Sequence, residues 1–361
     1  MKEGVKNIET LSLFYTAGVV LGTLFLSGTG LFLPAVLLPV LALPFFFQRR
    51  IIRWKEEVSI PLILLTFLML GFFCARTAAI PAVQEITPLE ALAAGAAARL
   101  RALIDAIPFQ ADSTAPLLKA LLTGDRSALT SATIAVFRGS GASHLLALSG
   151  LHMGILYLLF DGATRPFGHS PAARVVRYVL LMAGAGFFVL LTGAGPSVVR
   201  AFLFISINEL LRLLNRPQKP TRVFCVALLI QLVWNPAVVS SVGFQLSYLA
   251  MAGIFLVYPT LERWYPEGSR YNPFRWMWKA SALSISCQLF TAPLAWLRFH
   301  SFPRYFLLTN LTALPLTSVF MTVSVLTLAL GAAGLYPQLL ITATDGLGRL
   351  LLWILEIISS M

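Results

Sequence analysis

Long apolar runs separated by short polar loops dominate this chain. Residues 11–27 and 31–47 form the first two runs, joined by a Gly-Thr-Gly turn, and residues 60–79 form the third. A membrane-spanning helix needs about 20 apolar residues, because the hydrocarbon core of a bilayer is about 30 Å thick. The alternation of runs and loops therefore predicts an all-α polytopic integral membrane protein. We expect roughly nine to ten transmembrane helices, with short interfacial or amphipathic helices beside them.

Residues 80–142 break this pattern, because their acidic and basic side chains are balanced. The sequence Thr87-Pro88-Leu89-Glu90 is a capping box with proline at the first helical position, and it predicts an alanine-rich helix that ends before Pro108. A second helix is expected from about Ser113 to Gly124, and a third from about Thr130 to Arg138. We expect this segment to be extracytoplasmic or to lie at the outer membrane interface.

The last apolar segment, from about Gln338, carries a polar stripe. At 100° per residue, the following side chains fall close to one line along a helix: Gln338, Thr342, Asp345, Arg349 and Glu356. Asp345 and Arg349 are spaced as an i, i+4 ion pair. The pattern predicts an amphipathic helix that either lies in the membrane interface or turns its stripe into a polar cavity.

Composition excludes a soluble enzyme. The chain is 58% hydrophobic and 12% charged, with a mean hydropathy of +0.81, whereas soluble domains carry about 25% charged residues. The net charge of +12 fits an excess of Lys and Arg in cytoplasmic loops, and this rule places the N-terminus in the cytoplasm. Attraction of a polyanion such as DNA could also contribute to it. Cys74, Cys225 and Cys287 lie in apolar runs without CxxC spacing, which predicts free thiols.

Four apolar runs carry polar residues on one helical face. These faces are Ser197, Arg200, Asn208 and Asn215; Ser241, Gln245, Tyr248 and Ala252; Ser281, Ser284, Gln288, Thr291 and Ala295; and Asn310, Thr317 and Ser324. Small and polar residues can join helices to one another within a membrane. They can also line a shared polar cavity or pore, because isolated polar groups are costly in lipid. Both interpretations remain open for each face.

The segment HLLALSGLHMG, residues 144–154, concentrates the chemistry-bearing side chains. His144, Ser149 and His152 stand in an otherwise apolar stretch, and Gly150 can break a helix there. A serine beside a histidine allows a nucleophile–base pair, but no acidic residue lies near in sequence to orient the histidine. The spacing of the two histidines does not suit a metal, and no Cys or carboxylate accompanies them. We expect packing and hydrogen bonding around a broken helix, with no catalytic residue, no bound metal and no cofactor.

Several segments in order resemble the ComEC-type competence family. They are GDRSALT at 124–130, HLLALSGLHMG at 144–154, GPSVVRA at 195–201, NPAVVSSVGFQLSYLAMAG at 235–253, QLFTAPLAWLRFHSFP at 288–303 and TNLTALPLTS at 309–318. The resemblance covers roughly residues 115–325. It implies motif positions, as candidate channel residues, at His144, Ser149, Gly150, His152, Arg200, Asn208, Gln245, Gln288 and Asn310.

The resemblance also implies an organisation and a function. We expect N-terminal transmembrane helices in residues 1–80, a short extracytoplasmic helical linker in 81–115, and a competence-type channel domain with a C-terminal amphipathic helix in 116–361. Fuller family members carry an OB-fold and a metallo-β-lactamase-like domain. The linker is too short for that barrel, and no HxHxDH-type run is present, so neither domain is expected.

The implied protein is not an enzyme but a channel of the bacterial cytoplasmic (inner) membrane, which takes up single-stranded DNA during natural transformation. Its implied partners are single-stranded DNA, the lipid bilayer and separate DNA-receptor, nuclease and cytoplasmic ATPase proteins. Two alternatives stay open. A divergent paralogue could transport another substrate or act as a membrane scaffold, and an intramembrane hydrolase could use Ser149 and His152.

Overall fold

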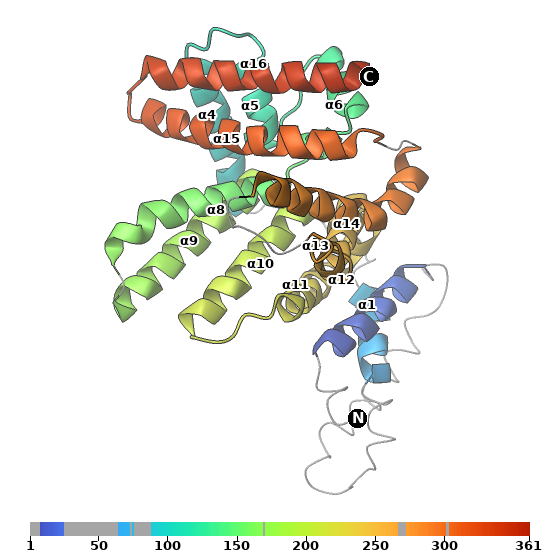
Figure 1. Cartoon of the computed structure of the whole chain (residues 1–361). Coiled ribbons are helices and arrows are strands. Elements are labelled where there is room, and N and C mark those ends of the chain that lie inside the picture. The colour runs from blue at the N-terminus through green and yellow to red at the C-terminus, as the bar shows by residue number, and fades with distance from the viewer. Residues whose placement is uncertain are drawn as a thin grey trace, which may run out of the picture. The chain divides into compact units, whose positions relative to one another are not determined.

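A computed structural model describes residues 8–24, 64–72, 74–75, 88–168, 170–265, 272–300 and 303–361 (Figure 1). Every regular element within these ranges is a helix, and none is a strand, which confirms the all-α prediction for them. The chain divides into two units. Unit 1 comprises Met1–Glu85 and Leu203–Gln245, and unit 2 comprises Ile86–Phe202 and Leu246–Met361. The division falls inside helices α10 (Pro196–Leu213) and α12 (Val242–Leu256).

Unit 1 is built around its first helix. It contains α1 (Ile8–Leu24), helical residues 64–72 and 74–75, α11 (Pro220–Trp234), the 3-10 helix η2 (Pro236–Ser240) and the adjoining parts of α10 and α12. Helix α1 packs against α11 and η2. The predicted second run, residues 31–47, and its connecting turn lie outside the described residues.

Small residues let α1 approach the helical residues 64–72 and 74–75 closely. A Cβ atom added to Gly18 would collide with the carbonyl oxygen of Leu68, and one added to Gly71 would collide with that of Tyr15. A Cβ on Gly22 would lie 2.8 Å from the Cβ of Ala75. Glycines four residues apart at a helix crossing are typical of membrane helix pairs, in which van der Waals packing replaces the hydrophobic effect as the driving force.

Unit 2 contains most of the remaining helices. These are α4 (Pro88–Ala106), α5 (Thr114–Thr123), α6 (Ser131–Gly139), α7 (Ser143–Leu146), α8 (Gly150–Thr164), η1 (Arg165–Phe167), α9 (Pro171–Leu191), α13 (Tyr258–Glu262), α14 (Pro273–Phe299), α15 (Phe306–Ala332) and α16 (Gln338–Ser360). Helices α4, α5 and α6 confirm the three helices predicted between residues 88 and 139. Thr87, the first residue of the predicted capping box, lies outside the described residues.

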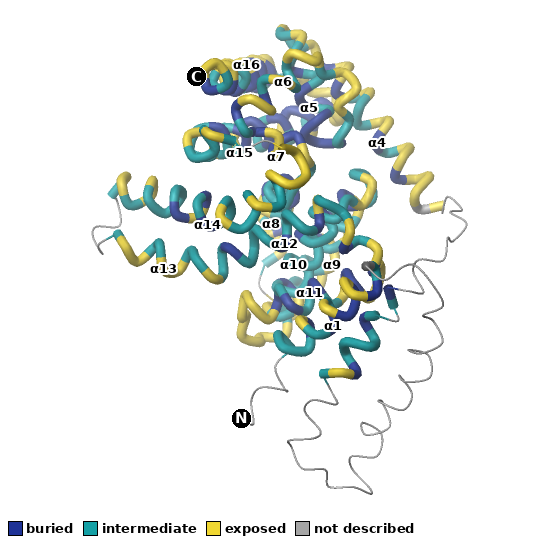
Figure 2. Tube along the Cα trace, turned by 90° about the vertical axis from the view of Figure 1, so that its right-hand side faces the viewer, coloured by how far each residue is buried: buried dark blue, intermediate teal, exposed yellow. Residues whose placement is uncertain are grey.

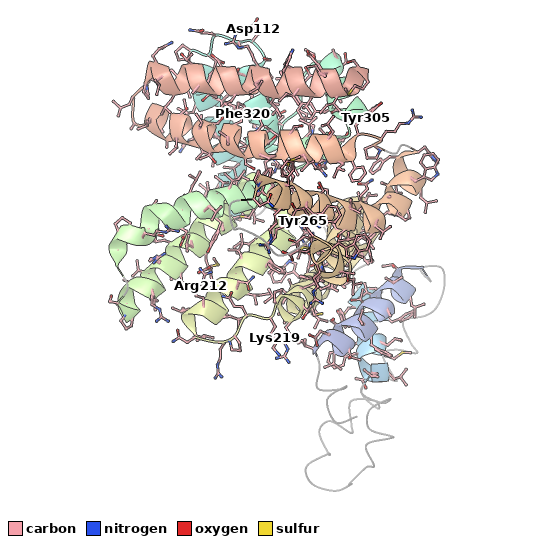
Figure 3. The ribbon with its side chains drawn as sticks, in the orientation of Figure 1. Asp112, Arg212, Lys219, Tyr265, Tyr305 and Phe320 are labelled. Carbon is pink, nitrogen blue, oxygen red and sulfur yellow. The ribbon has the colours of Figure 1, made fainter. Side chains whose placement is uncertain are left out.

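The core of unit 2 forms where α15 and α16 run side by side over α5 and α6 (Figure 1). Buried stretches of the backbone are dark blue in Figure 2. The fully buried residues of this core include Leu117, Leu118, Leu121, Phe137, Phe320, Ile341, Leu351 and Leu355. Gly348 leaves room for the ring of Phe320, labelled in Figure 3, because an added Cβ would lie 3.3 Å from it. The amphipathic pattern of α16 thus reflects packing against its neighbours.

Asp345 departs from the predicted polar stripe of α16. Its side chain is fully buried, and its Oδ2 accepts a hydrogen bond of 2.7 Å from the backbone N–H of Gln110. Arg349 is exposed, and no ion pair joins it to Asp345 in the described residues. The predicted pair is therefore wrong, because the carboxylate turns inward to satisfy an otherwise unpaired N–H at the approach to α5.

The polar face of α15 lies at a helix–helix contact. Thr317 and Ser324 are fully buried, and the hydroxyl groups of Thr327 and Thr344 lie 3.1 Å apart across the α15–α16 contact. The hydroxyl of Ser324 donates to the carbonyl of Phe320 in its own helix. For this stripe the structure favours the first of the two interpretations, in which polar residues join helices.

Three helices in the described residues are long and apolar enough to cross a membrane. They are Pro171–Leu191, Pro273–Phe299 and Phe306–Ala332. Shorter apolar helices cover Ile8–Thr23, Pro220–Trp234 and Val242–Leu256. These helices and the family evidence given below identify a membrane protein, while the full predicted number of spans stays a prediction.

We predict that Gly18→Ala destabilises the protein by about 1–3 kcal/mol, because the helices must separate to accept the methyl group. Thermal unfolding of the purified protein in detergent measures the effect. Gly154→Ala is the matched control, since Gly154 is also helical but has no neighbouring atom within 4 Å of an added Cβ. Equal unfolding temperatures for the two variants would contradict the close helix crossing.

Candidate functional site

The motif at residues 144–154 forms two helices separated by a short extended segment. Helix α7 ends at Leu146, and α8 begins at Gly150 after extended backbone at Ala147 and Ser149. The Ser149 hydroxyl accepts the N–H of Leu151 at 3.3 Å, and Nδ1 of His152 accepts the N–H of Ser149 at 3.3 Å. This reciprocal capping satisfies backbone donors that the break exposes. The predicted helix break is present, and Ser149 and His152 supply hydrogen-bond acceptors for its backbone N–H groups.

The motif GDRSALT stabilises the end of α7, on the N-terminal side of this break. Nη2 of Arg126 donates a hydrogen bond of 2.7 Å to the carbonyl oxygen of Leu146, the last residue of α7. Gly124 ends α5 in the left-handed conformation with φ of 76°, and a Cβ there would lie 2.8 Å from Cδ1 of Leu148. Only glycine combines that conformation with that clearance at no steric cost. The first two family motifs are therefore neighbours in space.

Asp125, in the same loop, holds its turn as a carboxylate. Its Oδ1 accepts hydrogen bonds from the hydroxyl of Ser127 at 2.6 Å and from its backbone N–H at 3.0 Å. These two hydrogen bonds lower the pKa of Asp125 below its usual value, and the positive charge of Arg101 adds to them. The turn therefore keeps its hydrogen-bonded carboxylate at neutral pH and loses it as the pH falls through the lowered pKa.

Arg200 lies beside the broken helix. An added Cβ on Gly150 would lie 3.4 Å from Nη2 of Arg200, so the guanidinium passes close to the first residue of α8. Nη1 donates a hydrogen bond to the carbonyl oxygen of Ser247, and the guanidinium carbon lies 5.9 Å from the ring centroid of Tyr248. The motifs containing Gly150, Arg200 and Ser247 thus converge on one cation.

Among the described residues, no carboxylate forms an ion pair with Arg200. The ion pairs formed by the described residues involve other cations, and none reaches this guanidinium. A partly buried charge in a weakly polar environment is costly unless a partner or a polar ligand compensates it. The contacts to Ser247 and Tyr248 compensate Arg200 only in part, because neither partner carries a charge.

The other predicted residues are placed as follows. Nδ1 of His144 lies 3.1 Å from the carbonyl oxygen of Gly141, and Oδ1 of Asn310 is buried with no hydrogen-bond partner among the described residues. Gln288 is partly buried on α14. Asn208 donates to the carbonyl of Phe204, and Gln245 to that of Val239, both within unit 1. His144, Ser149, Gly150, His152, Arg200, Gln288 and Asn310 all belong to unit 2.

The serine–histidine pair has the spacing of a nucleophile and a base but lacks the third group of a triad among the described residues. The Ser149 hydroxyl lies 3.0 Å from Nδ1 of His152, and Nε2 of His152 is buried with no partner in the described part of the chain. In a Ser-His-Asp triad an acidic group on that second nitrogen orients the histidine. The described residues also contain no group of three His, Cys, Asp or Glu side chains that could hold a metal ion.

Long-range contacts around the site escaped the sequence analysis. The Thr309 hydroxyl donates a hydrogen bond of 2.6 Å to the carbonyl oxygen of Ser140, which joins the start of α15 to the loop before α7. Arg126 was likewise not singled out, although it stands in the GDRSALT segment. Both Thr309 and Arg126 lie in segments that resemble the competence family, and this was the one sign in the sequence that they matter. A hydrogen bond between residues far apart in the chain leaves no periodic pattern in the sequence.

We predict that Gly124→Ala destabilises the protein more than Gly334→Ala does. Both glycines have φ of 76°, but nothing lies within 4 Å of an added Cβ on Gly334. In both variants the left-handed backbone conformation costs about 1 kcal/mol of stability. The collision with Leu148 should destabilise Gly124→Ala by about 1–3 kcal/mol more. The difference between the two unfolding temperatures in detergent measures this collision. Equal unfolding temperatures for the two variants would show that the close contact between Gly124 and Leu148 does not stabilise the broken helix.

Comparison with known proteins places this geometry in a family. The competence protein family profile matches residues 121–361. The chain is 28% identical to ComE operon protein 3 of Bacillus subtilis (strain 168), over 53% of this chain and 23% of that protein. It is 33% identical to competence protein ComA of Neisseria gonorrhoeae, over 47% and 25%. Identity to the uncharacterized protein YcaI of Escherichia coli (strain K12) is 26%, over 57% and 28%.

The matched region contains the broken helix, Arg200 and the long apolar helices α14 and α15. No solved structure matches the chain. The chain spans about a quarter of the length of the curated relatives that it matches. Because the family profile covers well over half of the sequence, this protein belongs to the competence protein family.

Proposed function

We propose that this protein is a channel of the bacterial inner membrane that takes up single-stranded DNA during natural transformation. Its family membership supports a role in competence and DNA uptake. To this general role the proposal adds that single-stranded DNA is the transported molecule and that it crosses the inner membrane. It also keeps the nine to ten spans and the cytoplasmic N-terminus that the apolar runs and basic loops predict.

The observation that carries the proposal is Arg200. A partly buried guanidinium that pairs with no carboxylate among the described residues offers an unneutralised charge beside an irregular backbone segment. Irregular backbone at membrane depth is tolerated where it lines a polar cavity, and a phosphodiester is the anion that a guanidinium recognises well. Arg200, Gly150 and the neighbouring motif positions would then line part of the path of the strand.

The proposed partners follow from the same reading. Single-stranded DNA is the transported molecule, and separate receptor, nuclease and cytoplasmic ATPase proteins would deliver it, trim it and drive it. The sequence contains no GxxxxGK[ST] segment, so we assign nucleotide hydrolysis to a partner. A paralogue with another substrate remains the alternative that the following experiment decides.

We predict that deletion of the gene abolishes entry of labelled DNA into the cytoplasm, and that Arg200→Ala fails to restore it. Loss of the charge should lower entry at least about tenfold, which corresponds to about 1.4 kcal/mol. Arg200→Lys should be intermediate, because an ammonium keeps the charge but not the planar fork. The measurement is nuclease-protected cytoplasmic DNA at equal amounts of protein in the membrane.

Arg216→Ala is the matched control, since Arg216 is an exposed cation in the loop after α10. It should leave entry unchanged. Normal entry in the deletion strain would remove DNA uptake as the function of this chain. Normal entry with Arg200→Ala, at normal membrane abundance, would remove Arg200 from the path and leave the uptake proposal to other residues.

The contact between Ser149 and His152 is the one observation that favours an enzyme. We predict that a fluorophosphonate probe labels wild-type protein and Ser149→Ala equally, because the second ring nitrogen of His152 has no orienting acid among the described residues. Ser149→Ala should instead lower thermal stability by about 0.5–2 kcal/mol through loss of the helix cap. Labelling that disappears with Ser149→Ala would support the hydrolase alternative.

A further inference from the structure

The two ends of α14 carry similar aromatic side chains but different charge environments. Trp296 and Phe299 near its C-terminal end are 56% and 58% exposed, and Phe274 and Trp276 near its start are 68% and 58% exposed. A helix of 27 residues is about 40 Å long at 1.5 Å per residue. Such a helix exceeds the hydrocarbon thickness, so its two ends reach opposite membrane surfaces if it spans.

At the start of α14 the basic side chains have acidic partners. Lys279 forms an ion pair of 2.7 Å with Glu262 of α13, and Arg275 also interacts electrostatically with Glu262. The hydrogen bond and charge of Lys279 lower the pKa of Glu262 below its usual value, so Glu262 is a carboxylate at neutral pH. Cations and aromatic rings at this end fit an ordinary cytoplasmic interface, with basic residues retained and aromatic residues at the headgroup level.

At the other end the cations stand alone. Arg298 and Arg304 are exposed and form no ion pair with any described residue. The sequence contains no acidic residue between Glu267 and Asp345. By the topology predicted from the basic loops this end is extracytoplasmic, where an excess of arginine is not expected. Membrane orientation therefore accounts for the basic residues at the start of α14 but not for those at its end.

The aromatic side chains at this end share one face. Trp296 and Phe299 are spaced at i and i+3 in α14, so their rings project from the same side of its last turn. His300 ends the helix in the left-handed conformation with φ of 49°, a position that glycine usually occupies. The chain then continues to exposed Arg304 and to Tyr305, which Figure 3 labels at the start of α15.

We propose that Trp296, Phe299, His300, Arg298 and Arg304 form an outer capture surface for single-stranded nucleic acid. Aromatic faces stack on bases of any sequence, and nearby cations contact the phosphates between them. A lipid interface would use the same rings but would not call for two unpaired arginines on the outer side. The inference rests on the proposed function, because it names where the transported strand first binds.

The test is binding of fluorescently labelled oligothymidylate to the purified full chain in nanodiscs. The double variant Trp296→Ala with Phe299→Ala should bind at least about tenfold more weakly, since each stacked base contributes substantially to affinity. The double variant Trp296→Phe with Phe299→Tyr should retain most of the binding. Phe274→Ala with Trp276→Ala is the matched control at the other end of the same helix, and it should bind as wild type does.

The charges are tested by the salt dependence of the same binding. Arg298→Gln with Arg304→Gln should reduce the slope of log affinity against log salt by about 1.4, because each phosphate contact to a single strand contributes about 0.7. An unchanged slope would show that the arginines do not contact phosphates and would overturn the proposal.

Two further outcomes separate this inference from the proposed function. Unchanged affinity in the aromatic double variant would identify the patch as a lipid belt and overturn the capture surface, while leaving the channel proposal intact. Absence of oligonucleotide binding by the wild-type protein would also overturn the capture surface. The channel proposal itself stands or falls on DNA entry into cells, which is measured without reference to this patch.

Discussion

The structure of the region around residues 144–154 depends on how the backbone groups freed by the break between α7 and α8 find partners. Away from water, an unpaired N–H or C=O costs as much as a lost hydrogen bond, so a broken helix persists only where other groups replace its ladder. Here Arg126 donates to the carbonyl of Leu146, the Ser149 hydroxyl accepts the N–H of Leu151 in α8, and His152 accepts the N–H of Ser149 just before α8. Two segments of the chain therefore combine to keep one irregular segment in place.

That arrangement also explains why glycine stands at position 124. Gly124 must allow Leu148 to approach at a left-handed φ. A side chain there would push the break away from its partners, whereas a Cβ on Gly150 would lie in ordinary contact with Nη2 of Arg200 at 3.4 Å. The break between α7 and α8, the residues that hydrogen-bond to it and Arg200 thus lie together in one site. There the irregular backbone positions polar groups that a continuous helix would point elsewhere.

Sequence reasoning succeeded where the cause is local. Thr130 caps the start of α6 and Gly124 ends α5 in the left-handed conformation, because signals of this kind act within one or two turns. It failed for Asp345, which helical spacing assigned to Arg349 but which packing turned towards Gln110. The contact between Thr309 and Ser140 was equally inaccessible, since only the folded chain brings these residues together. Rules that act over a few residues predict where helices begin and end. The hydrogen-bond partner of a buried polar group depends instead on which helices pack together in the folded chain.

The two cationic sites of unit 2 differ in a way that bears on transport. The outer surface around Trp296 is exposed, so water and salt weaken each contact and a strand can exchange there rapidly. Arg200 is partly buried, where one contact is stronger, but the carbonyl of Ser247 and the ring of Tyr248 already occupy part of its guanidinium. A conducting path needs sites that are favourable enough to enter and weak enough to leave. In the proposed channel, an exposed capture surface and a partly satisfied arginine would each meet that requirement, the first through solvent screening and the second through competing internal partners.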